Sequence, residues 1–200
     1  MTPQLAADPA AALEQLAAEL RAEGGVVSEH VAEPTAPPAF GLLVAAGPRC
    51  RDRGGDYAAV VEAVREGWLL HYGRPRLLGG LEPDLRLLIG DHLYARGIER
   101  LAGLGDMVAV TELADLISLT AQLDADDAVP AVREAAWLAA VVAIAAGPGD
   151  SHARGKAELR GFGDIAPLWE ATRSTAERAG LAGPLAGACE AVGFRAADLG

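Results

Sequence analysis

The run AAWLAAVVAIAA at residues 135–146 decides the fold of this chain. It contains no charged residue, and alanine and leucine are strong helix formers. A helix that is apolar on every side has no face for solvent, so it must lie in the middle of a helical bundle. Pro130 before the run and Gly147 after it are typical of a helix start and a helix end.

Helix signals continue on both sides of this run. We expect further helices at 9–23, from Asp56 to the break at Gly73, at 83–103, 106–123, 151–160, 164–179 and 184–191, with a short buried element at 40–46. No segment alternates apolar and polar residues as a strand would, so the predicted fold class is all-α. We expect a single domain overall, with an N-terminal helix and Pro-rich connector over 1–36 and the bundle over 37–200.

Composition and charge exclude several classes of function. The chain has 200 residues and a net charge of −11, so it lacks the positive surface that nucleic acids or anionic membranes attract. Cys50 and Cys189 are too far apart in sequence for a zinc motif or a disulfide framework. The apolar run ending at Gly147 is too short to span a bilayer, and no signal peptide is evident. We therefore expect a soluble, cytoplasmic protein.

The middle of the chain resembles a known family. LIGDHLYAR at 88–96, followed by LAGLGD at 101–106, is similar to the helix LAGDYLLAR…LA.LG of the trans-polyprenyl diphosphate synthases. Further motifs of that family are matched in order by FGLLVAA at 40–46, AVREGWLLH at 63–71, AVREAAWLAAVVAIAA at 131–146, LRGFG at 159–163 and LW at 168–169. The resemblance spans about residues 37–180 and implies a helical bundle like a truncated isoprenoid synthase fold.

The residues that perform the chemistry of this family are replaced here. Its two Asp-rich motifs hold magnesium ions against a diphosphate, which requires several carboxylate oxygens. The matching positions read HYGRPR at 71–76, without a carboxylate, and ATRSTAE at 171–177, with one. The family loop GKRLRP, which binds the second diphosphate, corresponds to TAPPA at 35–39. The resemblance therefore implies a member with no catalytic residue, no metal ligand and no cofactor.

The resemblance implies that a family member without these catalytic residues acts as a subunit. Family members commonly form dimers through the helix that matches 88–96, and some small members without Asp-rich motifs, such as component one of heptaprenyl diphosphate synthase, assist a catalytic subunit. We expect this chain to be a non-catalytic subunit of isoprenoid biosynthesis that forms an oligomer with a catalytic polyprenyl diphosphate synthase or with itself. The expected interface residues are Leu88, Asp91, Leu93, Tyr94 and Ile98.

The pattern of the 83–103 helix supports this interface. Its apolar residues cover more than the single stripe that one core face needs, which places the helix at the centre and leaves part of it for a partner. Asp91 lies either inside a packed interface or on the helix surface. One alternative is a self-associating helical protein that binds an isoprenoid or another apolar ligand without chemistry. Another is an enzyme of unrelated mechanism on the same bundle.

Other polar residues carry weaker signals. The cluster of Asp124, Asp126 and Asp127 is typical of a capping, solvated turn rather than a magnesium site. No histidine has a partner at metal-binding spacing, so we expect surface or helix-end positions for them. Cys189 is expected to be a buried, unreactive thiol. The basic residues around the turn after Gly73 are expected to form a solvated rim, which comprises Arg74, Arg76 and Arg86.

Overall fold

The computed structural model describes residues 8–199 of the chain. Every regular element in this range is a helix, and the only β-type pairing there is an isolated antiparallel bridge between Val31 and Leu78. The predicted all-α fold class and helical bundle are confirmed.

The helices follow the predicted ranges closely. They are α1 (Ala12–Glu23), α2 (Gly25–Ser28), α3 (Ala39–Ala46), α4 (Gly54–Tyr72), α5 (Pro83–Leu104), α6 (Met107–Ala125), α7 (Pro130–Ala146), α8 (Asp150–Phe162), α9 (Ala166–Arg178) and α10 (Ala182–Ala191), with 3-10 turns at Pro9–Ala11, Arg51–Arg53 and Ala196–Leu199. Asp106, the first residue of the predicted 106–123 helix, is the N-cap of α6, since its side chain accepts a hydrogen bond from the Ala109 amide at 3.1 Å. The helix expected to begin at Asp56 begins two residues earlier, at Gly54, so Asp56 lies in the first turn of α4.

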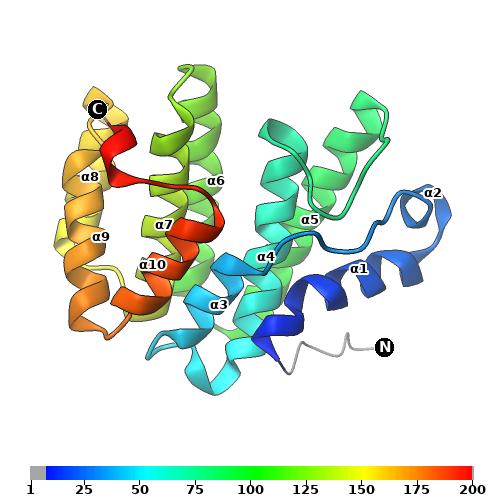
Figure 1. The fold of residues 1–200 in the computed structure, drawn as a ribbon, viewed down its shortest axis with the longest axis horizontal. Coiled ribbons are helices and arrows are strands. Elements are labelled where there is room, and N and C mark those ends of the chain that lie inside the picture. Colours follow the sequence, from blue (N-terminus) through cyan, green and yellow to red (C-terminus); the bar gives the residue numbers. More distant parts are fainter. Residues whose placement is uncertain (1–7, 200) are drawn as a thin grey trace.

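The helices form two groups that lie side by side (Figure 1). One group contains α1, α2, α4 and α5, and the other contains α6 to α10. Helix α3 contacts α4, α7 and α10, and therefore joins the two groups from one end. The N-terminal helix belongs to the first group, because Leu13, Leu16 and Leu20 pack in one cluster with Leu70 of α4 and Leu93 of α5.

Helices α4 and α7 are the buried helices of the two groups. In α7 all residues from Ala135 to Ala145 are buried, as the uncharged run predicts. The expectation that the 83–103 helix is central was wrong. Helix α5 buries only one face, through Ile89, Gly90, Leu93, Gly97 and Leu101, and its outer face is exposed.

Glycines allow α4 and α5 to approach each other closely. A Cβ atom added at Gly97 would lie 2.3 Å from Cγ2 of Val64, and one added at Gly67 would lie 2.9 Å from the carbonyl oxygen of Gly90. Neither distance is compatible with a side chain, so both positions require glycine at this helix spacing. The close approach covers one side of α4 and helps to bury it.

Candidate functional site

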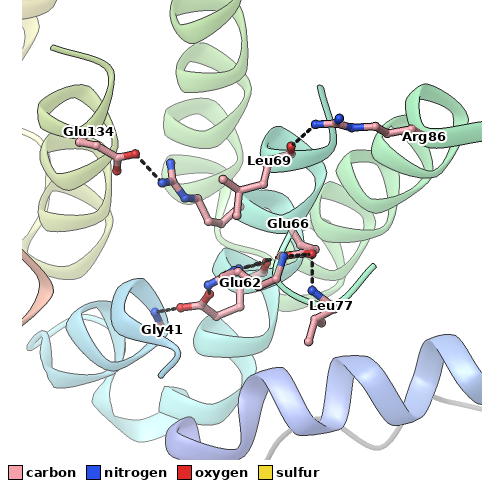
Figure 2. A network of polar contacts seen from close by, with 9 residues as sticks. Gly41, Glu62, Glu66, Leu69, Leu77, Arg86 and Glu134 are labelled. Atoms are coloured by element: carbon pink, nitrogen blue, oxygen red, sulfur yellow. Dashed lines mark hydrogen bonds and ion pairs between the residues drawn. The ribbon is translucent and has the colours of Figure 1, made fainter. Parts of the chain in front are cut away.

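Helix α4 carries three charged residues that are buried. Glu62 and Glu66 are fully buried, and Arg65 is 5% exposed. Burying a charge is costly unless it is paired and hydrogen-bonded, so each of these side chains needs a specific partner. Their partners come from three different segments of the chain, namely α3, the turn after α4, and α7, which makes α4 the polar centre of the fold (Figure 2).

The two glutamates share one arginine and tie two segments to α4. Glu62 accepts hydrogen bonds from the Gly41 amide and from Nη1 of Arg76, both at 2.6 Å. Glu66 accepts from the backbone amides of Arg76 and Leu77 at 2.7 and 2.8 Å, and from Nε of Arg76 at 3.0 Å. Opposing charges and satisfied lone pairs explain how both carboxylates are tolerated without solvent. The expected place of Arg76 on a solvated rim was therefore wrong.

Arg86 is also bound within the fold rather than on a rim. Its guanidinium donates to the carbonyl oxygens of Leu69, Leu70 and Gly73, with the Leu69 contact at 3.1 Å (Figure 2). These carbonyls lie at the C-terminal end of α4, where a helix leaves acceptors unpaired and favours a cation. Among the three arginines, only Arg74 is exposed as predicted.

Arg65 points from α4 toward α7 and pairs with Glu134. Its Nη2 donates to Oε1 of Glu134 at 2.6 Å. Desolvation by burial lowers the pKa of Arg65, and the charge and hydrogen bond of Glu134 partly offset that shift. The pair is an ionic link between the two helix groups.

Aromatic rings surround the Arg65 guanidinium. Its Cζ lies 4.3 Å from the ring centre of Trp68, 4.9 Å from that of Phe40 and 5.0 Å from that of Trp137. The last two rings also contact each other, with centres 5.6 Å apart. A cation over several aromatic faces gains cation–π stabilisation, which is largest where water is excluded. We call Arg65, Glu134, Phe40, Trp68 and Trp137 the Arg65 cluster.

Several buried polar atoms in and beside this cluster have no partner. Within residues 8–199, Nη1 of Arg65, Oε2 of Glu134, both indole nitrogens of the cluster and the hydroxyl of Tyr94 accept or donate no hydrogen bond. Buried polar groups in folded proteins are nearly always hydrogen-bonded, so such a concentration requires an explanation. The unpaired groups are concentrated around the Arg65–Glu134 pair.

The five predicted interface residues are separated by the structure. Leu88 is 66% exposed, and the Asp91 side chain is also exposed. Leu93 is fully buried in the core of the first group and is not available to a partner in this conformation. Tyr94 and Ile98 are partly buried and pack on the main core.

Tyr94 and Asp91 lie next to His71 at the end of α4. The ring of His71 stacks on Tyr94 with centres 5.2 Å apart and an angle of 8°. Nε2 of His71 lies 3.1 Å from Oδ1 of Asp91, although the angle between them is not that of a hydrogen bond. Of the two positions weighed for Asp91, the structure therefore places it on the helix surface.

A second buried ionic cluster joins α6 to α8. Glu112 accepts a hydrogen bond from Nζ of Lys156 at 3.0 Å and contacts Nε2 of His152 at 2.9 Å. Burial alone would raise the pKa of Glu112, but the hydrogen bonds and charges of these two partners outweigh it and lower the pKa. Of the two positions expected for the histidines, surface or helix end, His152 takes the second: it lies in the first turn of α8 and is 5% exposed. A cavity of about 10 Å³ beside these three residues has room for one water molecule.

The remaining predicted candidates form no site. Asp124 pairs with Arg133, while Asp126 and Asp127 are exposed in the turn before α7. No side chain of this turn caps α7, so the turn part of that prediction is confirmed and the capping part is wrong. Cys189 is partly buried, and desolvation raises its pKa, which opposes reactivity.

Comparison with known proteins gives no relative for this chain. No protein-family model, no curated protein and no solved structure matches it. Between residues 8 and 199, no helix has both the length and the apolar character needed to cross a membrane. In the same range, no group of three or more His, Cys, Asp or Glu side chains is arranged to hold a metal ion.

Proposed function

We propose that this chain is a non-catalytic helical subunit that associates with a catalytic trans-polyprenyl diphosphate synthase through the outer face of α5. The motif resemblance indicates which class of protein the partner belongs to. Both Asp-rich motifs are replaced, at 71–76 and 171–177, and this supports a non-catalytic role, because a diphosphate leaving group needs metal ions that carboxylates hold.

The exposed leucines of α5 are the observation that carries this proposal. Leu87 and Leu88 are 48% and 66% exposed on the helix that resembles the family's association helix. The two leucines are adjacent in sequence, and neighbouring exposed apolar side chains of this size mark interaction surfaces on soluble proteins more often than isolated ones do. The outer face of α5 is therefore the surface on which we expect the partner.

The arginine-rich turn supports the non-catalytic half of the proposal. In this chain Arg76 is engaged by Glu62 and Glu66, and Arg86 is engaged by the carbonyls at the end of α4. These cations hold the fold together and are not free to bind a diphosphate. The arginines at the end of α4 therefore stabilise the fold. In the family that the chain resembles, the same region carries the first Asp-rich motif, which binds magnesium.

The test uses a full-length trans-polyprenyl synthase with intact Asp-rich motifs from the same organism. We expect the purified chain to show no prenyl transfer alone, to bind the synthase in a titration, and to change its rate or product length. The variant Leu88→Arg should weaken binding at least tenfold without lowering the melting temperature, because the side chain is exposed. Phe162→Arg, at an 82% exposed position on α8, is the matched control and should bind as the wild type does.

Three outcomes would contradict the proposal. Magnesium-dependent turnover by the chain alone would show an enzyme. Equal loss of binding in Leu88→Arg and Phe162→Arg would remove α5 from the interface. A chain that forms homodimers through Leu88 but binds no synthase would instead be the self-associating protein of the alternative hypothesis.

A further inference from the structure

We propose that the outer face of α5 binds a protein surface that is apolar at its centre and positively charged around it, and that this face does not pair with a second copy of itself. The inference rests on the proposed function in one respect, because both place the partner on this face. The supporting observation is the distribution of charge around α5. The outer face consists of the exposed side chains between positions 84 and 102, which are Asp84, Leu87, Leu88, Asp91, His92, Ala95, Glu99 and Ala102.

Helix α5 contains as many acids as arginines, but the two kinds of charge lie on different sides of it. The acids are Asp84, Asp91 and Glu99, and the arginines are Arg86, Arg96 and Arg100. All three acids are exposed, whereas all three arginines are partly buried. The acids are spaced by seven and eight positions, which returns a helix to the same side after about two turns. The helix is therefore neutral in composition and acidic on its outer face.

The cations of α5 are held by the chain itself. Arg96 and Arg100 each pair with Glu19 of α1 at 2.6 Å, and Arg96 also pairs with Glu23. The third arginine is bound by the carbonyl oxygens at the end of α4. His92 is the other group on the outer face that can carry a positive charge, and its Nε2 lies 3.3 Å from Oε2 of Glu23. These cations are engaged inside the fold, so they do not neutralise the outer face.

The fold gives two of the exposed acids little to do. Asp84 lies in the first turn of α5, where a negative charge stabilises the helix itself. Asp91 and Glu99 lie further along and have no such role. The Asp91 side chain is 71% exposed and lies near His71, and Glu99 acts on Arg96 through its charge without an ion pair in the described residues. Both carboxylates are accessible to a partner.

An apolar centre lies among these charges. Leu88 follows Asp84 by one helical turn and precedes Asp91 by another, so the three side chains are neighbours on the helix surface. An apolar centre with a polar rim is the anatomy of specific protein interfaces, and rim charges select a partner of opposite sign. A face that served only for solvation would not need the exposed leucine. The complementary surface carries an apolar group with lysine or arginine around it.

A second copy of this chain is a poor occupant of the face. A symmetric dimer brings the same patch of both subunits together. The acids of α5 would then lie against the acids of the other copy, and like charges in contact oppose association. The same charge repels nucleic acids and anionic membranes. A basic protein surface is the occupant that the charge of the outer face favours.

The experiment uses two synthetic amphipathic helical peptides with identical leucine positions, one with lysine and one with glutamate at every polar position. Fluorescence anisotropy follows each titration in about 0.15 M salt, where charges further than about 8 Å from the peptide are largely screened. We expect one lysine peptide to bind per chain, the glutamate peptide to bind at least tenfold more weakly, and the free chain to be monomeric in light scattering. Equal binding of the two peptides, or a homodimer that Leu88→Ser dissociates, would overturn the proposal.

Paired substitutions test whether the peptide binds on α5. Asp91→Asn with Glu99→Gln removes two charges from the outer face and should weaken lysine-peptide binding at least fivefold. Glu158→Gln with Glu177→Gln is the matched control, because it removes the same charge from exposed positions on α8 and α9, on the opposite side of the molecule (Figure 1). The control should weaken binding less than twofold. Both variants change exposed side chains and should melt as the wild type does. Equal losses of binding in the two variants would contradict the assignment to α5.

The same variants, titrated with the catalytic synthase, separate this inference from the proposed function. If the wild-type chain binds the synthase and both paired variants bind it equally well, the charge complementarity is wrong and the proposed function stands. If no synthase binds, but the lysine peptide binds and is weakened only by the α5 substitutions, the proposed function is wrong and the basic partner of this face is supported.

Discussion

Helices α4 and α7 are buried to a similar extent but are built in opposite ways. From Ala135 to Ala145, α7 buries only apolar residues. Helix α4 buries Glu62, Arg65 and Glu66 among its apolar residues. The difference teaches that a central helix does not need an uncharged sequence, provided that every buried charge finds a partner on another segment. It also separates two roles, since α7 fills the core and α4 connects the segments around it.

The largest effects are expected from two opposite substitutions, one that adds a charge to α7 and one that removes a charge from α4. Leu138→Glu would place a carboxylate in α7, where the side chain is fully buried and no partner is arranged for it. The penalty for a buried unpaired ion is several kcal/mol, and domains of this kind have only about 5–15 kcal/mol of stability. We expect loss of cooperative unfolding at neutral pH, measured by circular dichroism during urea titration. Leu138→Met is the control and should cost less than about 1.5 kcal/mol.

The opposite exchange should also destabilise, although it makes α4 more apolar. Glu66→Leu removes the acceptor of the Arg76 and Leu77 amides and leaves the arginine with a single carboxylate partner. Breaking a buried pair by removing one partner costs about 3–5 kcal/mol. Urea unfolding should show this loss, while the same change at the exposed Glu99 should alter stability by less than about 0.5 kcal/mol. A neutral or stabilising Glu66→Leu would mean that hydrophobicity alone decides burial in this fold.

The glycine contact that covers α4 offers a smaller test. In Gly97→Ala the new methyl group would overlap Val64, so the two helices must separate slightly or shift. Overpacking of this kind costs about 1–3 kcal/mol. Gly103→Ala, on the same helix but with no atom within 4 Å, should be neutral or slightly stabilising. Equal effects of the two variants would show that close helix approach is not required.

Acidification should weaken the second group through the cluster between α6 and α8. The pKa values of Glu112 and Asp115 are lowered in the folded chain, because hydrogen bonds and positive charges outweigh the opposing effect of burial. A lowered folded-state pKa gives stability that is present above the unfolded-state pKa and is lost as pH falls through the folded-state value. The melting temperature should therefore fall with acidification below about pH 4.5. Glu112→Gln should melt lower at neutral pH and show a smaller decrease, and an unchanged slope would exclude Glu112 as a contributor.

The candidate site was only partly accessible to sequence reasoning. Glu62, Arg65 and Glu66 are surrounded by apolar residues at nearly every position of their helix, and this pattern can indicate buried charge. Their partners could not be inferred, because Arg65 and Glu134 are 69 positions apart and Glu112 and His152 are 40 apart. The predicted interface on α5 mixed surface and core residues, since the apolar stripe does not tell which leucines face the chain's own helices.

The sequence by itself determined that the protein is all-α, where each long helix lies to within about two residues at its ends, and that α7 is buried. These properties depend on local propensity, on glycine and proline at helix ends, and on the absence of charge in one run, all of which are readable within a few turns. The tertiary structure alone decided that α4 and not α5 is the second central helix, and which cation neutralises which carboxylate. Charge pairing and helix burial depend on contacts between distant segments, and a periodic pattern does not specify the partner that completes them.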